Sequence, residues 1–161
     1  MLTLNALAGA TVGALTAAAA QSDVRRMEIP DYISIAIALI ALADHFWNGG
    51  SALLPDAALG AGVFAAGFLC WLRGWLGGGD VKLLSALSFY FGLGGAEKFM
   101  FSLAVASILL GLISIALSLT MPKAGADGAT WRGSALKQPM PYGLALASAT
   151  LATLVWAALS P

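Results

Sequence analysis

Six apolar stretches, separated by short polar or glycine-rich segments, make up most of this chain. They cover residues 2–20, 32–47, 53–75, 80–93, 99–121 and 142–159. Hydrophobic residues amount to 60% of the chain and charged residues to 10%, whereas a soluble domain carries about 25% charged residues. Because lipid offers the backbone no hydrogen bonds, such stretches cross a bilayer as α-helices. The sequence therefore predicts an all-α, multi-pass protein of the lipid bilayer.

The predicted architecture is one membrane-embedded domain, residues 1–161, built as a polytopic helix bundle with about six transmembrane segments. No Lys or Arg precedes the first apolar stretch, which favours a membrane helix over a cleaved signal peptide. The fourth segment is short for a span, which needs about 20 residues, and a glycine-rich hinge opens it. In the third segment Gly60, Gly62 and Gly67 predict a small-residue face, on which helices pack closely in membranes.

Charge and cysteine content argue against several classes of protein. The net charge is zero, so no broad attraction to nucleic acid is expected. The chain has one cysteine, Cys70, and one histidine, which allow neither an intrachain disulfide nor a usual metal site. We therefore expect no metal and no other cofactor.

Positive charges predict the orientation in the membrane. Six of the eight Lys and Arg residues fall on one side of the six-segment arrangement: Arg25, Arg26, Arg73, Lys123, Arg132 and Lys137. Because cytoplasmic loops are enriched in Lys and Arg, this side should face the cytoplasm and both termini should lie outside. Asp23 and Asp80 are then cytoplasmic, whereas Asp44 and Asp56 belong to the opposite face.

Two acids stand at helix junctions on the predicted cytoplasmic face. Asp23 follows the end of the first helix, and Asp80 opens the fourth segment directly after Gly77-Gly78-Gly79. An acid at the mouth of a hydrophobic helix is costly to place and is usually functional. Two such carboxyl groups that converge on one water could share a proton, so that one acts as base and the other as acid.

Each of these acids also has a purely structural interpretation. Asp80 could cap a helix in a turn, and Asp23 could pair with the neighbouring arginines. Asp31 could replace Asp23 as the partner, although its place after Pro30 in the first turn of the second helix suits a role toward the helix dipole. Lys82 is expected to extend toward the membrane interface. By spacing alone, an aspartic protease is one possibility among several.

Three motifs, in this order along the chain, resemble those of the bacterial type IV prepilin peptidases, which are membrane aspartic proteases. The first is Asp23 followed by Arg25-Arg26 and Ile29-Pro30-Asp31. The second, Gly77-Gly78-Gly79-Asp80-Val81-Lys82-Leu83, resembles the Gly-x-Gly-Asp-x-Lys-Leu signature of the family. The third, Pro141-Tyr142-Gly143, resembles the opening of the family's last helix. The three motifs together extend over nearly the whole chain.

The resemblance implies that Asp23 and Asp80 are the catalytic pair, with Gly78 and Gly79 supporting the backbone around Asp80. It implies a prepilin substrate, whose short basic leader is cut at the cytoplasmic face of the bacterial inner membrane, just before a hydrophobic helix. Larger members carry an N-terminal domain, often with paired Cys-x-x-Cys, and also methylate the new N-terminus. The chain shows no counterpart of that domain. We therefore expect a peptidase without methyltransferase activity, similar to that of the Flp pilus, with archaeal preflagellin peptidases as an alternative.

Two other classes of function compete with a peptidase. A small transporter or channel could use Asp80 as an ion site in a broken helix, but it predicts inverted repeats, which the sequence does not show. A pilus-assembly scaffold would use both acids only as caps and should tolerate Asn at either position. The sequence leaves open the oligomeric state and whether Asp23 and Asp80 are close at rest. One hypothesis is that the glycine hinge holds them apart until substrate arrives.

Overall fold

The computed structural model describes residues 2–120 and 142–159, which form five α-helices and no strand. The helices are α1 (Leu2–Arg26), α2 (Asp31–Trp47), α3 (Leu53–Leu72), α4 (Gly78–Thr120) and α5 (Tyr142–Leu159). By length and composition, α3, the Gly78–Ala116 part of α4, and α5 are able to cross a membrane. The prediction of an all-α membrane bundle is confirmed, with five helices in the described ranges instead of six separate segments.

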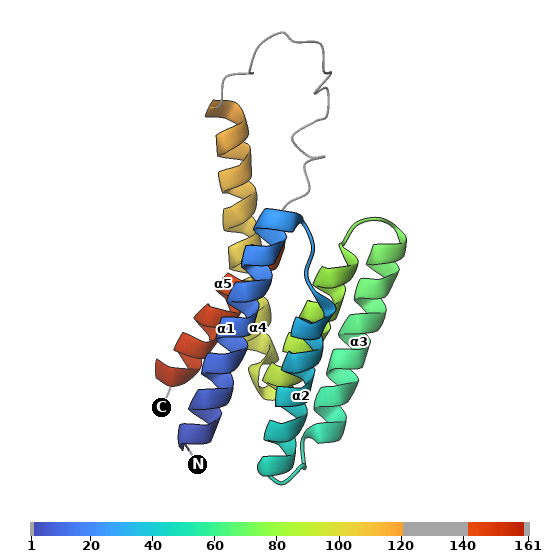
Figure 1. The fold of residues 1–161 in the computed structure, drawn as a ribbon, viewed down its shortest axis with the longest axis vertical. Coiled ribbons are helices and arrows are strands. Elements are labelled where there is room, and N and C mark those ends of the chain that lie inside the picture. Colours follow the sequence, from blue (N-terminus) through green and yellow to red (C-terminus); the bar gives the residue numbers. More distant parts are fainter. Residues whose placement is uncertain (1, 121–141, 160–161) are drawn as a thin grey trace.

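The difference arises because the fourth and fifth predicted segments are joined in α4. The glycine-rich residues 92–95 mark the boundary between these two segments, and the change of direction there comes from Gly92, which departs from helical geometry with φ 58° and ψ −174°. This conformation is open almost only to glycine, so a single residue bends the chain while residues 93–95 stay helical. Figure 1 shows the consequence, with α4 running down one arm to the bend and back up along a second arm. We call residues 78–91 the first arm and residues 93–120 the second arm.

The connection between α1 and α2 also differs from expectation. Helix α1 continues to Arg26, so Asp23 lies in its last turn and not beyond its end. Met27 ends the helix with a φ of 53°, and its N–H donates to the Asp23 carbonyl over 2.8 Å. Pro30 immediately precedes α2 instead of lying in its first turn, while Asp31 occupies that turn as predicted.

The two ends of the bundle carry different features. In Figure 1 the α1–α2 connection and the start of α4 lie at one end, and both termini lie at the other with the α2–α3 turn and the bend of α4. One apolar core joins α1, α2, both arms of α4 and α5; among its members are Val12, Ile33, Ile37, Leu83, Leu87, Phe99 and Leu146. This arrangement brings the C-terminal end of α1 next to the start of α4, although the two are far apart in sequence.

Helix α3 packs against the first arm of α4 through two glycines. A Cβ at Gly60 would lie 2.9 Å from the Phe89 Cβ, and one at Gly67 would lie 2.9 Å from a Val81 methyl group. Gly62, in contrast, faces no atom within 4 Å. The predicted small-residue face is therefore formed by Gly60 and Gly67, seven residues and about two turns apart, and does not include Gly62.

We expect Gly60→Ala to destabilise the bundle by about 1–3 kcal/mol, because the new methyl group would force α3 away from the backbone and Cβ of α4. Gly62→Ala is the matched control on the same helix, and it should leave stability unchanged or slightly raised. Thermal unfolding of the two purified variants in detergent measures the difference. Equal unfolding temperatures would contradict the close approach at Gly60.

Candidate active site

Asp23 and Asp80 line the same cavity, which has a volume of about 310 Å³. The rest of its lining comes from the turn after α1 and the glycine-rich start of α4: Met27, Glu28, Ile29, Gly77, Gly78 and Gly79. Asp23 reaches the cavity from the last turn of α1, and Asp80 from the first turn of α4. The two predicted site residues are therefore brought together at one cavity.

Asp23 is held in place by the start of α5. The backbone N–H of Gly143 donates a hydrogen bond of 2.8 Å to Oδ2 of Asp23, which is only 8% exposed. A Cβ at position 143 would lie 2.9 Å from the Asp23 Cβ and 3.0 Å from its Oδ2. Only glycine therefore allows the helix terminus to approach closely enough to donate, and the positive end of the α5 dipole faces the carboxyl group.

Asp80 is the third residue of α4, and its side chain turns back toward Gly77, the residue directly before the helix. The Gly77 N–H bonds its carboxyl group, and a Cβ at Gly77 would lie 2.7 Å from Oδ2. This is the geometry of an acid that caps the N-terminus of its own helix. Its Oδ1 is buried, and no group in the described part of the chain donates to it. A buried carboxyl oxygen without a partner is rare in proteins, and here it is one of two acids at the same cavity.

The glycine triplet brings α4 close to the α1–α2 connection. A Cβ at Gly79 would lie 2.9 Å from the Ile29 Cβ and 3.3 Å from the Ile29 carbonyl oxygen. Ile29 is itself buried, with 8% exposure. A larger residue at position 79 would push the start of α4 off this connection, and with it Asp80 away from Asp23.

A second, smaller cavity of about 150 Å³ lies on another side of Asp80. Its lining is mostly apolar and comes from both arms of α4 and from α5: Leu76, Leu84, Leu103, Ser107, Tyr142, Ala145 and Leu146, in addition to Asp80. Asp80 therefore stands between a polar cavity and an apolar one.

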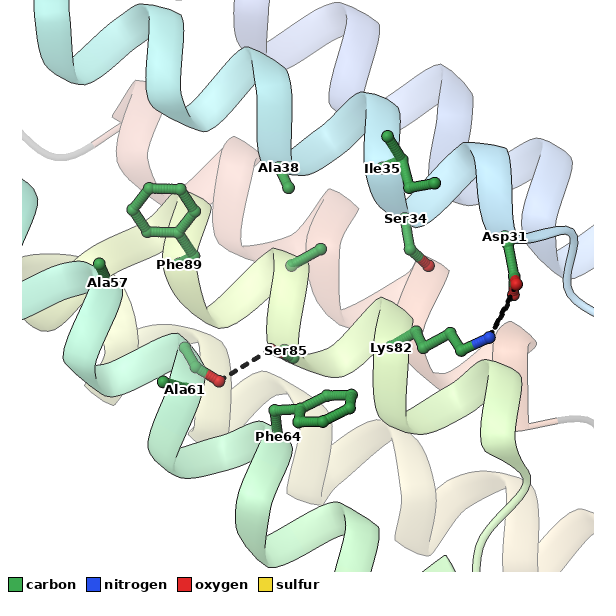
Figure 2. A pocket seen from close by; sticks show the side chains of 12 residues that line it. Asp31, Ser34, Ile35, Ala38, Ala57, Ala61, Phe64, Lys82, Ser85 and Phe89 are labelled. Carbon is green, nitrogen blue, oxygen red and sulfur yellow. Dashed lines mark hydrogen bonds and ion pairs between the residues drawn. The ribbon is translucent and has the colours of Figure 1, made fainter.

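Lys82 does not join the two acids, because it projects from a different face of α4. Its Nζ bonds both carboxylate oxygens of Asp31, over 2.7 and 2.8 Å. Figure 2 shows this pair at one end of a groove of about 440 Å³ between α2, α3 and the first arm of α4. Asp31 is thus paired with Lys82 and does not line the cavity of Asp23 and Asp80.

We expect Lys82→Met to change stability by less than about 1 kcal/mol, because both partners of the pair are largely exposed. Asp31→Asn should have the same small effect, and the double variant should add little to either. Denaturant unfolding of the three variants in detergent provides the measurement. A loss well above this range for both single variants would show that the pair is a structural link between α2 and α4.

The structure describes some, but not all, of the remaining predicted motif residues. Tyr142 begins α5 and lines the apolar cavity, and Pro30 precedes α2, whereas Pro141 lies outside the described residues. Within residues 2–120 and 142–159, no three His, Cys, Asp or Glu side chains gather in a way that could hold a metal ion.

Sequence reasoning missed a polar cluster at the opposite end of the bundle. His45 Nε2 and Asp56 Oδ2 lie 2.8 Å apart, across the turn between α2 and α3. The sequence did contain an indication of this cluster, because a histidine and an acid flank a short glycine-containing turn at the ends of two apolar helices. Asp44 and Asp56 were assigned to the face opposite Asp23, and neither lines the cavity of Asp23 and Asp80.

Comparison with known proteins assigns the family. The family model for the type IV leader peptidase family matches residues 10–116, a segment that contains both Asp23 and Asp80. The chain belongs to the type IV leader peptidase family. The predicted resemblance to prepilin peptidases is thereby confirmed, and α5 with Gly143 lies beyond the segment that the family model matches.

Two similar proteins are named prepilin leader peptidase/N-methyltransferase, from Burkholderia pseudomallei strains 1026b and K96243. Each is 31% identical over 144 residues, which cover 82% of this chain. The chain spans only 40% of the length of these relatives. No solved structure matches this member of the type IV leader peptidase family.

Proposed function

We propose that this protein is an aspartic endopeptidase that removes the leader from prepilins at the cytoplasmic face of the membrane, with Asp23 and Asp80 as catalytic residues. The observation that carries the proposal is the cavity that the two carboxyl groups share. One oxygen of Asp80 is buried with no donor among the described residues, so a proton on this carboxyl group or a hydrogen bond from a substrate would satisfy it. Membership of the type IV leader peptidase family supports the reaction class.

The chemistry requires the two acids to hold one proton between them. The ionised carboxylate removes a proton from a water, whose oxygen attacks the carbonyl carbon of the scissile peptide bond. The protonated carboxyl group donates its proton to the carbonyl oxygen as the tetrahedral intermediate forms. The intermediate then collapses: one of its hydroxyl groups returns a proton to the carboxylate that had donated it, the C–N bond breaks, and the leaving amine takes up the proton that the other carboxyl group had removed from the water. Because the two groups titrate as a pair, neither role is assigned to one residue.

The surroundings of the pair suit a substrate with a basic leader followed by a hydrophobic helix. Glu28 lines the polar cavity together with Asp23, so a positively charged leader would meet acids there. The apolar cavity on the other side of Asp80 offers space for an apolar side chain. Three arginines lie at or just beyond the ends of α1 and α3 at this end of the bundle: Arg25, Arg26 and Arg73. These positive charges favour a cytoplasmic placement of this end.

Cleavage of a co-expressed Flp-type prepilin tests the proposal directly. We expect bacterial membranes that contain both proteins to show a faster-migrating, shortened prepilin, and membranes without the peptidase to show only the full-length form. Mass spectrometry of the product identifies the cut bond and tests the expectation of an unmethylated N-terminus. An archaeal preflagellin, tested in parallel, distinguishes the two substrate classes. If neither substrate is shortened at comparable expression, the proposed function is wrong.

A further inference from the structure

The bend of α4 is surrounded by buried polar groups that the proposed reaction does not use. Asp56, in the first turn of α3, is 8% exposed although α3 is apolar enough to span a membrane. Its Oδ1 accepts a hydrogen bond of 2.7 Å from the N–H of Leu93, the residue directly after the bend. At Gly92 a Cβ would collide with the same carboxyl group. A buried acid in an apolar helix is costly, and this one bonds the backbone where α4 changes direction.

His45 completes this cluster from α2. Its Nδ1 lies 2.8 Å from the Ala41 carbonyl, which can only accept, so Nδ1 carries a hydrogen. Its Nε2 lies 2.8 Å from Asp56 Oδ2, a distance that requires one proton between these atoms. The ring also stacks on Phe89 of the first arm, with centroids 5.2 Å apart. The cluster thus ties α2 and α3 to both sides of the bend.

The angle at this bend determines how far apart the two arms of α4 lie. The apolar cavity beside Asp80 is bounded by Leu84 on the first arm and by Leu103 and Ser107 on the second. The second arm also contacts α5, where the Phe101 and Trp156 rings meet edge to face. Because the start of α5 bonds Asp23, a change at the bend would alter both the cavity beside Asp80 and the placement of its partner acid.

We propose that His45 and Asp56 are positioning residues, which hold the bend of α4 at Gly92 and so set the width of the cavity beside Asp80. The structural part of this proposal stands alone, and its effect on cleavage rests on the proposed peptidase function. The two residues touch neither carboxyl group of the proposed catalytic pair. They act through the arms of α4, from the end of the bundle opposite the site (Figure 1).

The distance between the arms can be measured by double electron–electron resonance. Spin labels at Leu72 and Leu112 suit this purpose, because both side chains are exposed and α3 packs on the first arm while Leu112 lies on the second. Cys70 is replaced by Ala so that only these two sites are labelled. We expect one narrow distance distribution for this background protein. Asp56→Ala should broaden or shift the distribution, because the Leu93 N–H and His45 then lose their common partner.

Two further variants separate positioning from a general loss of structure. Asp56→Asn keeps an acceptor for the Leu93 N–H and a donor for neutral His45, so it should restore the narrow distribution. His45→Leu removes one side of the cluster and leaves the Leu93 bond, so it should broaden the distribution even if Asp56→Ala does not fold. Gly62→Ala, on the same helix as Asp56, is the control and should leave the distribution unchanged, because the added Cβ would meet no atom within 4 Å. Unchanged distances in both Asp56→Ala and His45→Leu would overturn the proposal.

Cleavage of the prepilin by the same variants tests the link to the site. We expect Asp56→Ala and His45→Leu to cleave roughly tenfold to a hundredfold more slowly at equal amounts of folded protein, since small misplacements of catalytic groups have effects of this size. Asp56→Asn should cleave nearly as fast as the unaltered protein. Altered distances with unchanged cleavage would overturn the positioning role. If the unaltered protein cleaves nothing, the peptidase function fails, while the distance measurement still decides whether the cluster holds the bend.

Discussion

Replacing either Asp23 or Asp80 with Asn is expected to lower prepilin cleavage by roughly a thousandfold or more, as is usual when one member of a cooperating catalytic set is removed. Asn has nearly the same shape as Asp but cannot accept or deliver the proton that the reaction transfers. Because the two acids line one cavity and act as a pair, the double variant should be little worse than either single variant. The measurement is the rate of appearance of shortened prepilin in membranes with matched enzyme levels.

Asp31→Asn and Asp44→Asn are the controls for this prediction, and both should retain cleavage. Asp31 is paired with Lys82 outside the shared cavity, and Asp44 lies near the opposite end of the bundle. Cleavage that survives Asp23→Asn but not Asp31→Asn would show that Asp31 is the partner of Asp80. Cleavage that survives both Asp23→Asn and Asp80→Asn would exclude the aspartic mechanism. The transporter and scaffold hypotheses for the two acids would then have to be considered again.

Gly143→Ala should lower cleavage by about tenfold to a hundredfold, the equivalent of roughly 1.4–2.7 kcal/mol in transition-state stabilisation. The added methyl group would lie 2.9 Å from the Asp23 Cβ, so either α5 must withdraw or the Asp23 side chain must turn. Both movements break the 2.8 Å hydrogen bond from the Gly143 N–H. Asp23 would then be displaced in the cavity without being removed.

Gly111→Ala is the matched control for this variant. Position 111 lies in the second arm of α4, where a Cβ would meet no atom within 4 Å, so cleavage should stay unchanged. Thermal unfolding of both variants in detergent distinguishes a displaced Asp23 from a destabilised bundle, because only Gly143→Ala should lose activity in protein that remains folded. A Gly143→Ala enzyme with full activity would show that the α5 terminus does not position Asp23.

The sequence alone determined the class of protein and the identity of its candidate site residues. Long apolar stretches in a chain with few charges can satisfy their backbone only as membrane helices, so the all-α bundle did not depend on knowing any contact. The acids at the helix junctions, Asp23 and Asp80, stood out because charge is costly beside apolar helices. The order of the three motifs then predicted the family that the comparisons confirmed.

The tertiary structure alone decided how these residues meet. Whether Asp23 and Asp80 share a cavity depends on close approaches at Gly79 and Gly143, where a missing side chain leaves no periodic signal in the sequence. The same holds for the bend at Gly92, because one backbone conformation there replaces a whole turn. Long-range polar pairs such as Lys82 with Asp31 and His45 with Asp56 depend on how the helices rotate about their axes. Local sequence sets the helices, but only their packing sets that rotation.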